Sequence, residues 1–131
     1  MTQPAPRPLP LAGIRIISAE SYGAGPYGTL FLAQLGADVI KIEPPQRHGK
    51  GGGDTARAVG PHWLRDGESL YFQTFNLNKR SLTLDLATRE GQAVLHRLVM
   101  KSDAVANNLR GDIPAKLGLT YDALAAVNPA I

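Results

Sequence analysis

Residues 11–43 constrain the fold most, because they have the pattern of a strand, a turn, a helix and a second strand. The β-branched run at residues 14–17 is typical of a buried strand. The glycine-rich turn at residues 22–26 ends in Pro26, which suits the first turn of a helix. Gly36 can end that helix in the left-handed conformation, and residues 39–42 are again apolar. The stretch therefore predicts a βαβ unit with parallel strands and the helix on one face.

The glycine-rich turn also indicates a possible ligand. Such a turn directs backbone N–H groups and the positive end of the helix dipole toward an anion or a polarised carbonyl. A purely structural turn is an equally good interpretation. Gly23, Gly25 and Gly28 fit the spacing of the dinucleotide-binding fingerprint, with Glu43 near the position of its acidic partner. The match is partial, because Pro44 and Pro45 follow Glu43 directly.

Composition limits the classes of function. The 131 residues are enough for one domain, and 44% of them are hydrophobic. The chain has no cysteine, which excludes disulfides and thiolate metal sites, and we expect no metal. The net charge of +3 comes from basic residues scattered along the chain, which disfavours nucleic-acid binding. No apolar run is long enough to cross a bilayer, so we expect a cytoplasmic protein that does not bind membranes.

The rest of the chain alternates between strand and helix patterns. Residues 1–10 contain four prolines and predict a disordered lead-in, and residues 46–60 predict a polar loop. Further expected elements are a strand carrying Leu82, Leu84 and Leu86, a helix from Thr88 to about residue 101, a strand at 104–106, a helical turn at 113–117 and a helix from Thr120 to about residue 127. This alternation predicts an α/β fold with a Rossmann-like parallel sheet and flanking helices. Ile131 would begin another strand, so we expect a truncated chain with an incomplete sheet.

Several motifs in this order resemble the N-terminal part of family III (CaiB/BaiF-type) CoA-transferases. They are LAGIRI at 11–16, AGPYGT at 24–29, LGADVIKIE at 35–43, FNLNKRSLTLDL at 75–86 and NLRGDIPAKLGLTYDAL at 108–124. The resemblance assigns residues 11–131 to the N-terminal part of a CoA-binding α/β domain. It implies CoA transfer between carboxylic acids through an aspartyl-CoA intermediate, in an interlocked homodimer. The nucleophilic Asp of that family lies beyond Ile131, so no catalytic residue is expected in this chain.

The resemblance also implies contacts to coenzyme A, the only cofactor that we expect, here as an acyl-CoA substrate. Gly23 and Ala24 would lie near the thioester, and Lys116 would contact a CoA phosphate. The path of the nucleotide and pantetheine would be lined by Leu84, Asp85, Leu86, Ala87, Asn108, Leu109 and Arg110. Alternatively, Leu84 and Leu86 are core residues, and Arg110 and Lys116 are ordinary solvated charges.

Departures from the family pattern concern the CoA and acyl contacts. Ala87 and Pro44 stand where basic residues are frequent, and Gly23 stands where oxalate-using members carry Gln. Arg47, Lys50 or Arg57 could supply the missing charges. Two other functions stay open: an acyl-CoA racemase of the same superfamily, and a non-catalytic module that binds CoA or a nucleotide.

Overall fold

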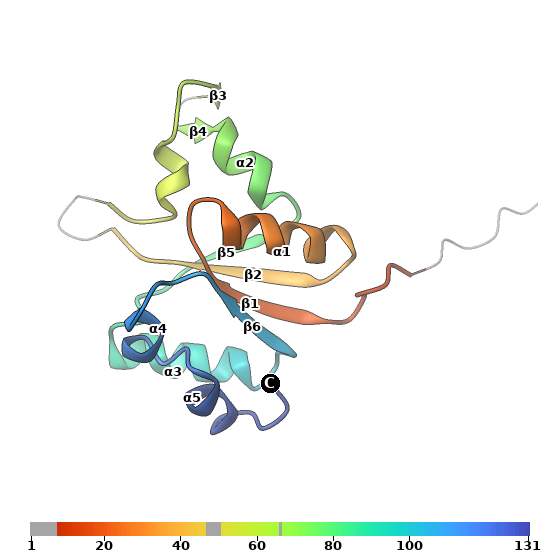
Figure 1. The fold of residues 1–131 in the computed structure, drawn as a ribbon, viewed down its shortest axis with the longest axis vertical. Helices are drawn as coiled ribbons and strands as arrows, with labels where there is room; N and C mark the ends of the chain where they lie inside the picture. Colours follow the sequence, from red (N-terminus) through yellow and green to blue (C-terminus); the bar gives the residue numbers. More distant parts are fainter. Residues whose placement is uncertain (1–7, 47–50, 66) are drawn as a thin grey trace, which may run out of the picture.

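A four-stranded parallel sheet forms the centre of the molecule (Figure 1). The computed structural model describes residues 8–46, 51–65 and 67–131. The strand order is β5-β2-β1-β6, with β1 at Arg15–Ala19, β2 at Asp38–Glu43, β5 at Arg80–Thr83 and β6 at Ala104–Asn107. The predicted α/β class with a parallel sheet is confirmed.

The βαβ unit forms as its sequence predicts. Helix α1 spans Ala24–Gln34 between β1 and β2, and Pro26 lies in its first turn. Gly36 has a φ of 101°, the left-handed conformation that favours glycine at a helix end. The parallel register places Ile17 beside Ile40, and β2 ends at the residue before Pro44. Proline cannot donate to a ladder, which explains why the strand stops there.

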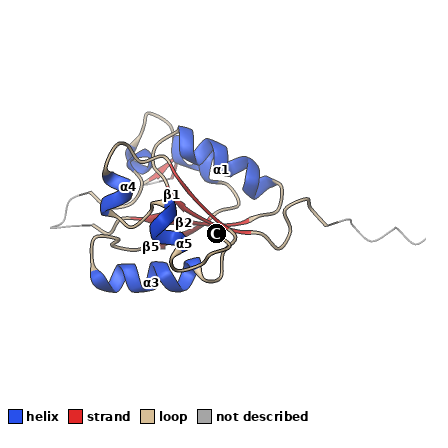
Figure 2. Cartoon of the chain, turned by 60° about the horizontal axis from the view of Figure 1, so that its bottom comes forward, coloured by secondary structure: helices blue, strands red, loops and turns tan. Residues whose placement is uncertain are grey.

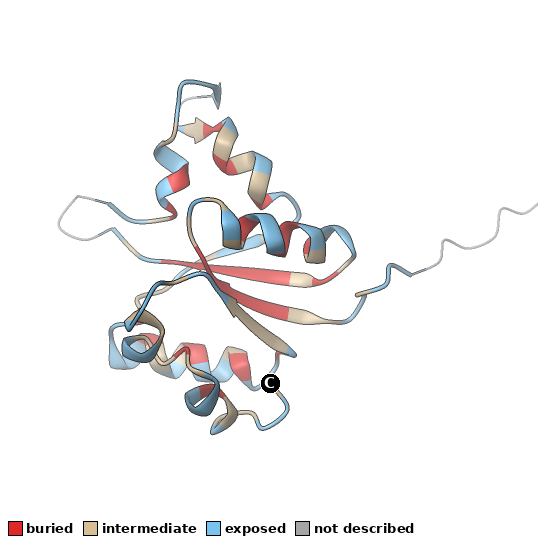
Figure 3. Cartoon of the chain, in the orientation of Figure 1, coloured by how far each residue is buried: buried red, intermediate tan, exposed pale blue. Residues whose placement is uncertain are grey.

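Helices cover both faces of the sheet, as Figure 2 shows for α1 and for α3, which spans Arg89–Val99. The larger apolar core lies on the α3 side and contains Ile17, Ile40 and Leu95. A smaller apolar cluster on the α1 side contains Ile16 and Val39. Successive side chains of a strand point to opposite faces, so β1 and β2 supply both cores and are the most buried strands (Figure 3).

Strand β5 and helix α3 are joined by a turn that the sequence pattern did not reveal. We expected the strand to continue through Leu84 and Leu86, but it ends at Thr83. The Asp85 carboxylate accepts a hydrogen bond from the Ala87 N–H, and the Asp85 carbonyl accepts one from the Thr88 N–H. This local bonding turns the chain away from the sheet. Thr88 then caps α3 through the Gly91 N–H, as predicted.

A small layer on the α1 side connects β2 to β5. It comprises the 3-10 helix η1 (Thr55–Ala58), strands β3 (Trp63–Arg65) and β4 (Glu68–Ser69), which form an antiparallel hairpin, and helix α2 (Leu70–Asn76). The sequence patterns did not predict helix α2. The ring centroid of Phe75 in α2 lies 6.0 Å from that of Tyr27 in α1, so aromatic side chains pack these two helices together.

The C-terminal elements are shorter than their patterns predicted. Helix α4 spans Ile113–Lys116 and helix α5 spans Tyr121–Ala125, with Thr120 capping α5 as expected. Ile131 is not in a strand: its N–H donates to the Asn128 carbonyl, and its side chain contacts the core on the α3 side. Of the predicted lead-in, residues 1–7 lie outside the described residues.

Candidate functional site

A cavity of about 460 Å³ lies at the carboxyl ends of the parallel strands, where ligands commonly bind in open α/β sheets. Most of its wall is apolar, contributed by Ile42, Leu84, Leu86, Leu109 and Leu117, with smaller residues between them. Its charged lining among the described residues consists of Glu20, Asp54 and Asp85. The cavity therefore suits an uncharged and largely apolar group.

Five of the residues implied by the resemblance line this cavity. Leu84, Asp85, Leu86, Ala87 and Leu109 all line it, although they come from two distant parts of the chain. Leu86 also belongs to the core on the α3 side, and Leu84 packs against that core, as the alternative interpretation predicts.

The glycine-rich turn lies beside the cavity rather than within its lining. Ala24 lines a second cavity of about 310 Å³ between α1 and the end of β6. A Cβ atom on Gly23 would lie 3.3 Å from the Tyr71 hydroxyl, so that ring covers the position. The Tyr22 N–H donates to the Asp54 carboxylate over 2.8 Å, so this N–H of the turn bonds to protein.

Asn108 fastens the loop between β1 and α1 to the end of β6. Its side-chain oxygen accepts from the Ser21 N–H, and its side-chain nitrogen donates to the Ser21 carbonyl, both over 3.0 Å. A Cβ atom on Gly25 would lie 2.7 Å from the Asn108 side chain, which explains the glycine there. Both polar atoms of the Asn108 side chain therefore bond to the backbone of Ser21.

The two cationic candidates are exposed next to lining residues. Arg110 directly follows Leu109, and Lys116 directly precedes Leu117, so both lie close to the cavity along the chain. The Lys116 ammonium lies 2.5 Å from the Asp112 carboxylate, in a pair that is exposed on both sides. Of the other basic residues considered, Arg47 and Lys50 lie outside the described residues.

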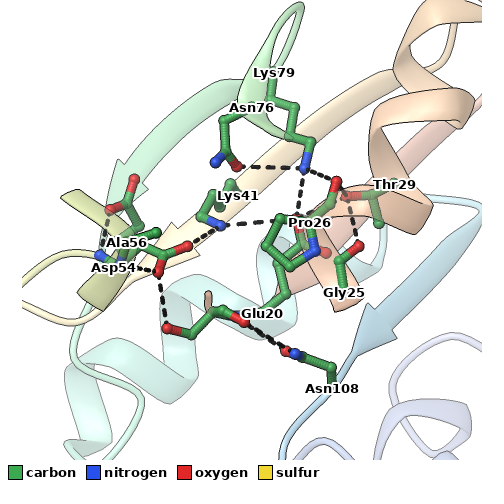
Figure 4. Close-up of polar contacts among 12 residues, drawn as sticks. Glu20, Gly25, Pro26, Thr29, Lys41, Asp54, Ala56, Asn76, Lys79 and Asn108 are labelled. Atoms are coloured by element: carbon green, nitrogen blue, oxygen red, sulfur yellow. Dashed lines mark hydrogen bonds and ion pairs between the residues drawn. The ribbon is translucent and has the colours of Figure 1, made fainter. Parts of the chain in front are cut away.

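A buried ionic cluster lies under α1, and sequence reasoning missed it. Lys41 is 1% exposed; its ammonium lies 2.6 Å from the Asp54 carboxylate and 3.8 Å from that of Glu20 (Figure 4). The Lys79 ammonium lies 2.9 Å from Glu20 on the other side. Two ammonium groups thus face two carboxylates, which compensates for the desolvation of each charge. Figure 4 shows that these side chains come from β2, the β1–α1 loop and the segments before η1 and β5.

Asp54 connects this cluster to the rim of the cavity. One carboxylate oxygen accepts from Lys41, and the other accepts from the Ser21 hydroxyl and the N–H groups of Tyr22 and Ala56. Burial alone raises the pKa of the Asp54 carboxyl, but these donors outweigh it and keep the pKa below its usual 3.8. Asp54 is therefore an ionised anchor for two loops.

Glu20 has one bonded and one unbonded carboxylate oxygen. Its Oε1 accepts from the Thr29 hydroxyl over 2.7 Å and from Lys79, whereas its Oε2 is buried and has no hydrogen-bond partner among the described residues. Burial lowers the pKa of the Lys79 ammonium, although the hydrogen bond to Glu20 opposes this effect.

Glu43 does not act as the acidic partner of a dinucleotide fingerprint. It is 2% exposed, and its carboxylate accepts two hydrogen bonds from Arg57, one from Ser81 and one from the Asp54 N–H. Burial alone raises the pKa of the Glu43 carboxyl, but these donors outweigh it and lower the pKa below 4.5. Both carboxylate oxygens of Glu43 are occupied by protein donors, so its role is structural. The interpretation of the glycine turn as a dinucleotide-binding fingerprint with Glu43 as acidic partner is therefore wrong. Arg57 likewise serves Glu43 rather than a ligand.

One sequence signal could have revealed the cluster. In the strand Val39-Ile-Lys-Ile-Glu43, the two charged residues share a face with Val39, which is buried against α1. Charged residues on the inner face of a buried parallel strand require partners.

Histidines and metal ligands do not add to the site. Within the described ranges, no group of three or more His, Asp or Glu residues could hold a metal ion. His62 and His96 are exposed, and His48 lies outside the described residues.

Comparison with known proteins supports a family assignment. The sequence model described as CoA-transferase family III matches residues 11–131. This chain belongs to that family. The family III chain is 43% identical over its whole length to a succinate–glutarate CoA-transferase of Agrobacterium fabrum and 38% identical over 99% of its length to an acetyl-CoA:oxalate CoA-transferase of Acetobacter aceti.

A solved structure supports the fold as well. A CAIB/BAIF family protein from Brucella suis superposes with a TM-score of 0.81 and 37% identity over 93% of the family III chain. The chain spans only about a third of the length of these relatives, covering 33% and 32% of the two enzymes and 32% of the structure. In the part of the chain that the structure describes, no helix is both long and apolar enough for a bilayer crossing.

Proposed function

We propose that this chain is the N-terminal, CoA-binding part of a CoA-transferase that moves CoA between carboxylic acids. The observation that carries the proposal is the cavity at the carboxyl edge of the sheet. Its walls include Leu84, Asp85, Leu86, Ala87 and Leu109, the segments that the resemblance relates to CoA. The named relatives act on succinate, glutarate and oxalate, so we propose small dicarboxylic acids as substrates.

The charge of the cavity suggests how a CoA thioester would lie. The described lining of the cavity contains no Lys or Arg side chain that could bind a phosphate group, and most of its wall is apolar. The pantetheine arm is uncharged, so it suits an apolar wall better than the phosphate groups do. We therefore propose that the arm occupies the cavity, with the phosphates outside it, near Arg110 and Lys116.

The chemistry that we propose is covalent catalysis by an Asp carboxylate outside these residues. The carboxylate attacks the thioester and forms a mixed anhydride, releasing the CoA thiolate. The thiolate then attacks the aspartyl carbonyl, which forms aspartyl-CoA and frees the first acid. The carboxylate of the second acid attacks aspartyl-CoA, which forms a second mixed anhydride and releases the CoA thiolate. The thiolate finally attacks the carbonyl of the second acid, which gives the new acyl-CoA and restores the Asp carboxylate. In this scheme the present residues bind and orient the thioester. The interlocked homodimer remains part of the proposal.

The test combines transfer with binding. The native polypeptide that carries this sequence is incubated with succinyl-CoA and glutarate, and glutaryl-CoA is measured by chromatography. Ala87→Trp should abolish transfer by filling the cavity, whereas Ala115→Trp on exposed α4 serves as the matched control. CoA binding without transfer would favour the non-catalytic module. Epimerisation of a 2-methylacyl-CoA would favour the racemase, and absence of CoA binding would contradict all three.

A further inference from the structure

The side-chain amide of Gln92 joins two walls of the cavity. Its Nε2 donates to the Leu86 carbonyl over 2.5 Å and to the Leu117 carbonyl over 3.0 Å. Both carbonyls belong to residues that line the cavity, one in the β5–α3 turn and one at the end of α4. Gln92 itself lies on α3, outside the lining, and therefore acts on the cavity only through these two residues.

The chemistry of this contact is specific to a long primary amide. An amide nitrogen carries two N–H donors, which matches two carbonyl acceptors. A carboxylate of the same length has no donor, and asparagine is one methylene shorter. Gly118 has a φ of 67°, and a Cβ atom there would lie 2.7 Å from the Gln92 side-chain oxygen. The glycine thus gives the amide room between the two segments.

The two walls depend on Gln92 to different extents. Helix α3 is a firm base, because Leu95 and Val99 are fully buried in the core. The turn carrying Leu86 is also held by its approach to Gly91, where a Cβ atom would lie 1.9 Å from the Asp85 carbonyl oxygen. The segment of the Leu117 wall packs on the core through Leu117 and the buried Leu119, and Gln92 adds a hydrogen bond that ties its backbone to α3. Loss of the amide should therefore release the Leu117 side first.

We propose that Gln92 is a positioning residue that sets the separation of the two cavity walls. The separation fixes the width available to an uncharged ligand group. The identity of that group as the pantetheine arm of CoA rests on the proposed function, whereas the link between the walls does not.

The first test needs no ligand. Hydrogen exchange of the native polypeptide is compared with that of Gln92→Met and Gln92→Glu, with Ala93→Met as the matched control on the exposed side of α3. The amides of residues 116–119 bond to carbonyls of residues 112–115, so their exchange reports opening of this segment. Both Gln92 variants should exchange faster there by about tenfold, with little change at residues 84–87. Exchange equal to that of the control would overturn the proposal.

The second test separates positioning from general stability. Isothermal titration calorimetry measures the dissociation constants of CoA and of adenosine 3′,5′-bisphosphate, which lacks the pantetheine arm. Gln92→Met should weaken CoA binding about tenfold and change binding of the bisphosphate less than about twofold. Equal weakening of both ligands would mean a merely structural role and would overturn the proposal.

Two further outcomes are also decisive. If the unchanged protein binds neither ligand, the proposed function is wrong, and the exchange data alone decide the role of Gln92. If Gln92→Met does not fold, Gln92→Asn keeps an amide that is too short for both carbonyls, and it should show the same faster exchange at residues 116–119. Exchange like that of the unchanged protein would contradict the proposal.

Discussion

The two faces of the central sheet are built from the same strands but bury different kinds of side chain. The face toward α3 is apolar along its length, with Ile17, Ile40 and Ile42 packed against Leu95 and Val99. The face toward α1 begins with Ile16 and Val39 and then changes character. Ser18, Lys41 and Glu43 follow on that face, and each is 2% exposed or less. One face thus supplies a hydrophobic core, and the other carries charges into the interior.

The difference shows what each face contributes to the cavity. Ala19 and Ile42, on the apolar face, form part of its wall. Lys41, on the charged face, holds Asp54, which in turn holds Ser21 and the start of η1 at the cavity rim. A buried ion pair contributes little net stability, since desolvation offsets the attraction, but it fixes the geometry of the groups that it joins.

The largest expected effect comes from breaking the charged face. Lys41→Met leaves the buried Asp54 carboxylate without its nearest cation and leaves Glu20 paired with Lys79 alone. We expect the free energy of unfolding to fall by about 3–5 kcal/mol, as measured by urea denaturation. Lys101→Met, an exposed change of the same kind, is the control. A loss no greater than that of the control would contradict a structural role for the cluster.

The next effect tests the apolar face. Leu95 is fully buried against the sheet, so Leu95→Ala should cost about 2–5 kcal/mol through lost burial and the resulting cavity. Met100→Ala, a change at an exposed residue, is the control.

Urea titrations of the Leu95 and Lys41 variants at two pH values test the two faces further. The Leu95 loss should be the same at both pH values, whereas the Lys41 loss should shrink in acid, because a protonated Asp54 carboxyl no longer needs a cation. A pH-dependent Leu95 loss would contradict this division of roles.

The smallest effect is the acid dependence of the unchanged protein. Folding lowers the pKa values of Asp54 and Glu43 below their usual 3.8 and 4.5. The native state therefore binds fewer protons than the unfolded state, and the stability from these groups is fully present above their unfolded pKa values. It should be lost as the pH falls through the lower, folded values. Urea titrations between about pH 2 and about pH 7 would measure this loss. Glu43→Gln should flatten the acid limb, and an unchanged limb would mean that other carboxyls control it.

Local patterns predicted those elements whose conformation depends on neighbours in the chain. The strand–helix–strand order of residues 11–43, the left-handed Gly36 and the Thr88 cap all have local causes. The resemblance led to four consecutive cavity residues, Leu84 to Ala87, before any geometry was known. Helix α2 was missed, because its aromatic residues make sense only against Tyr27 in α1.

The sequence by itself determined the class of fold, the order of its main elements and the family, because periodicity, turn residues and motifs are encoded locally. Only the tertiary structure decided which charges are buried and which residues meet at the cavity. The buried ionic cluster joins residues from distant parts of the chain, and Glu20 and Lys79 lie 59 positions apart. No local pattern pairs these residues. Their partners are selected by the parallel register of β1 and β2 and by the loops that close over α1, since a buried charge is stable only where an opposite charge is brought to it.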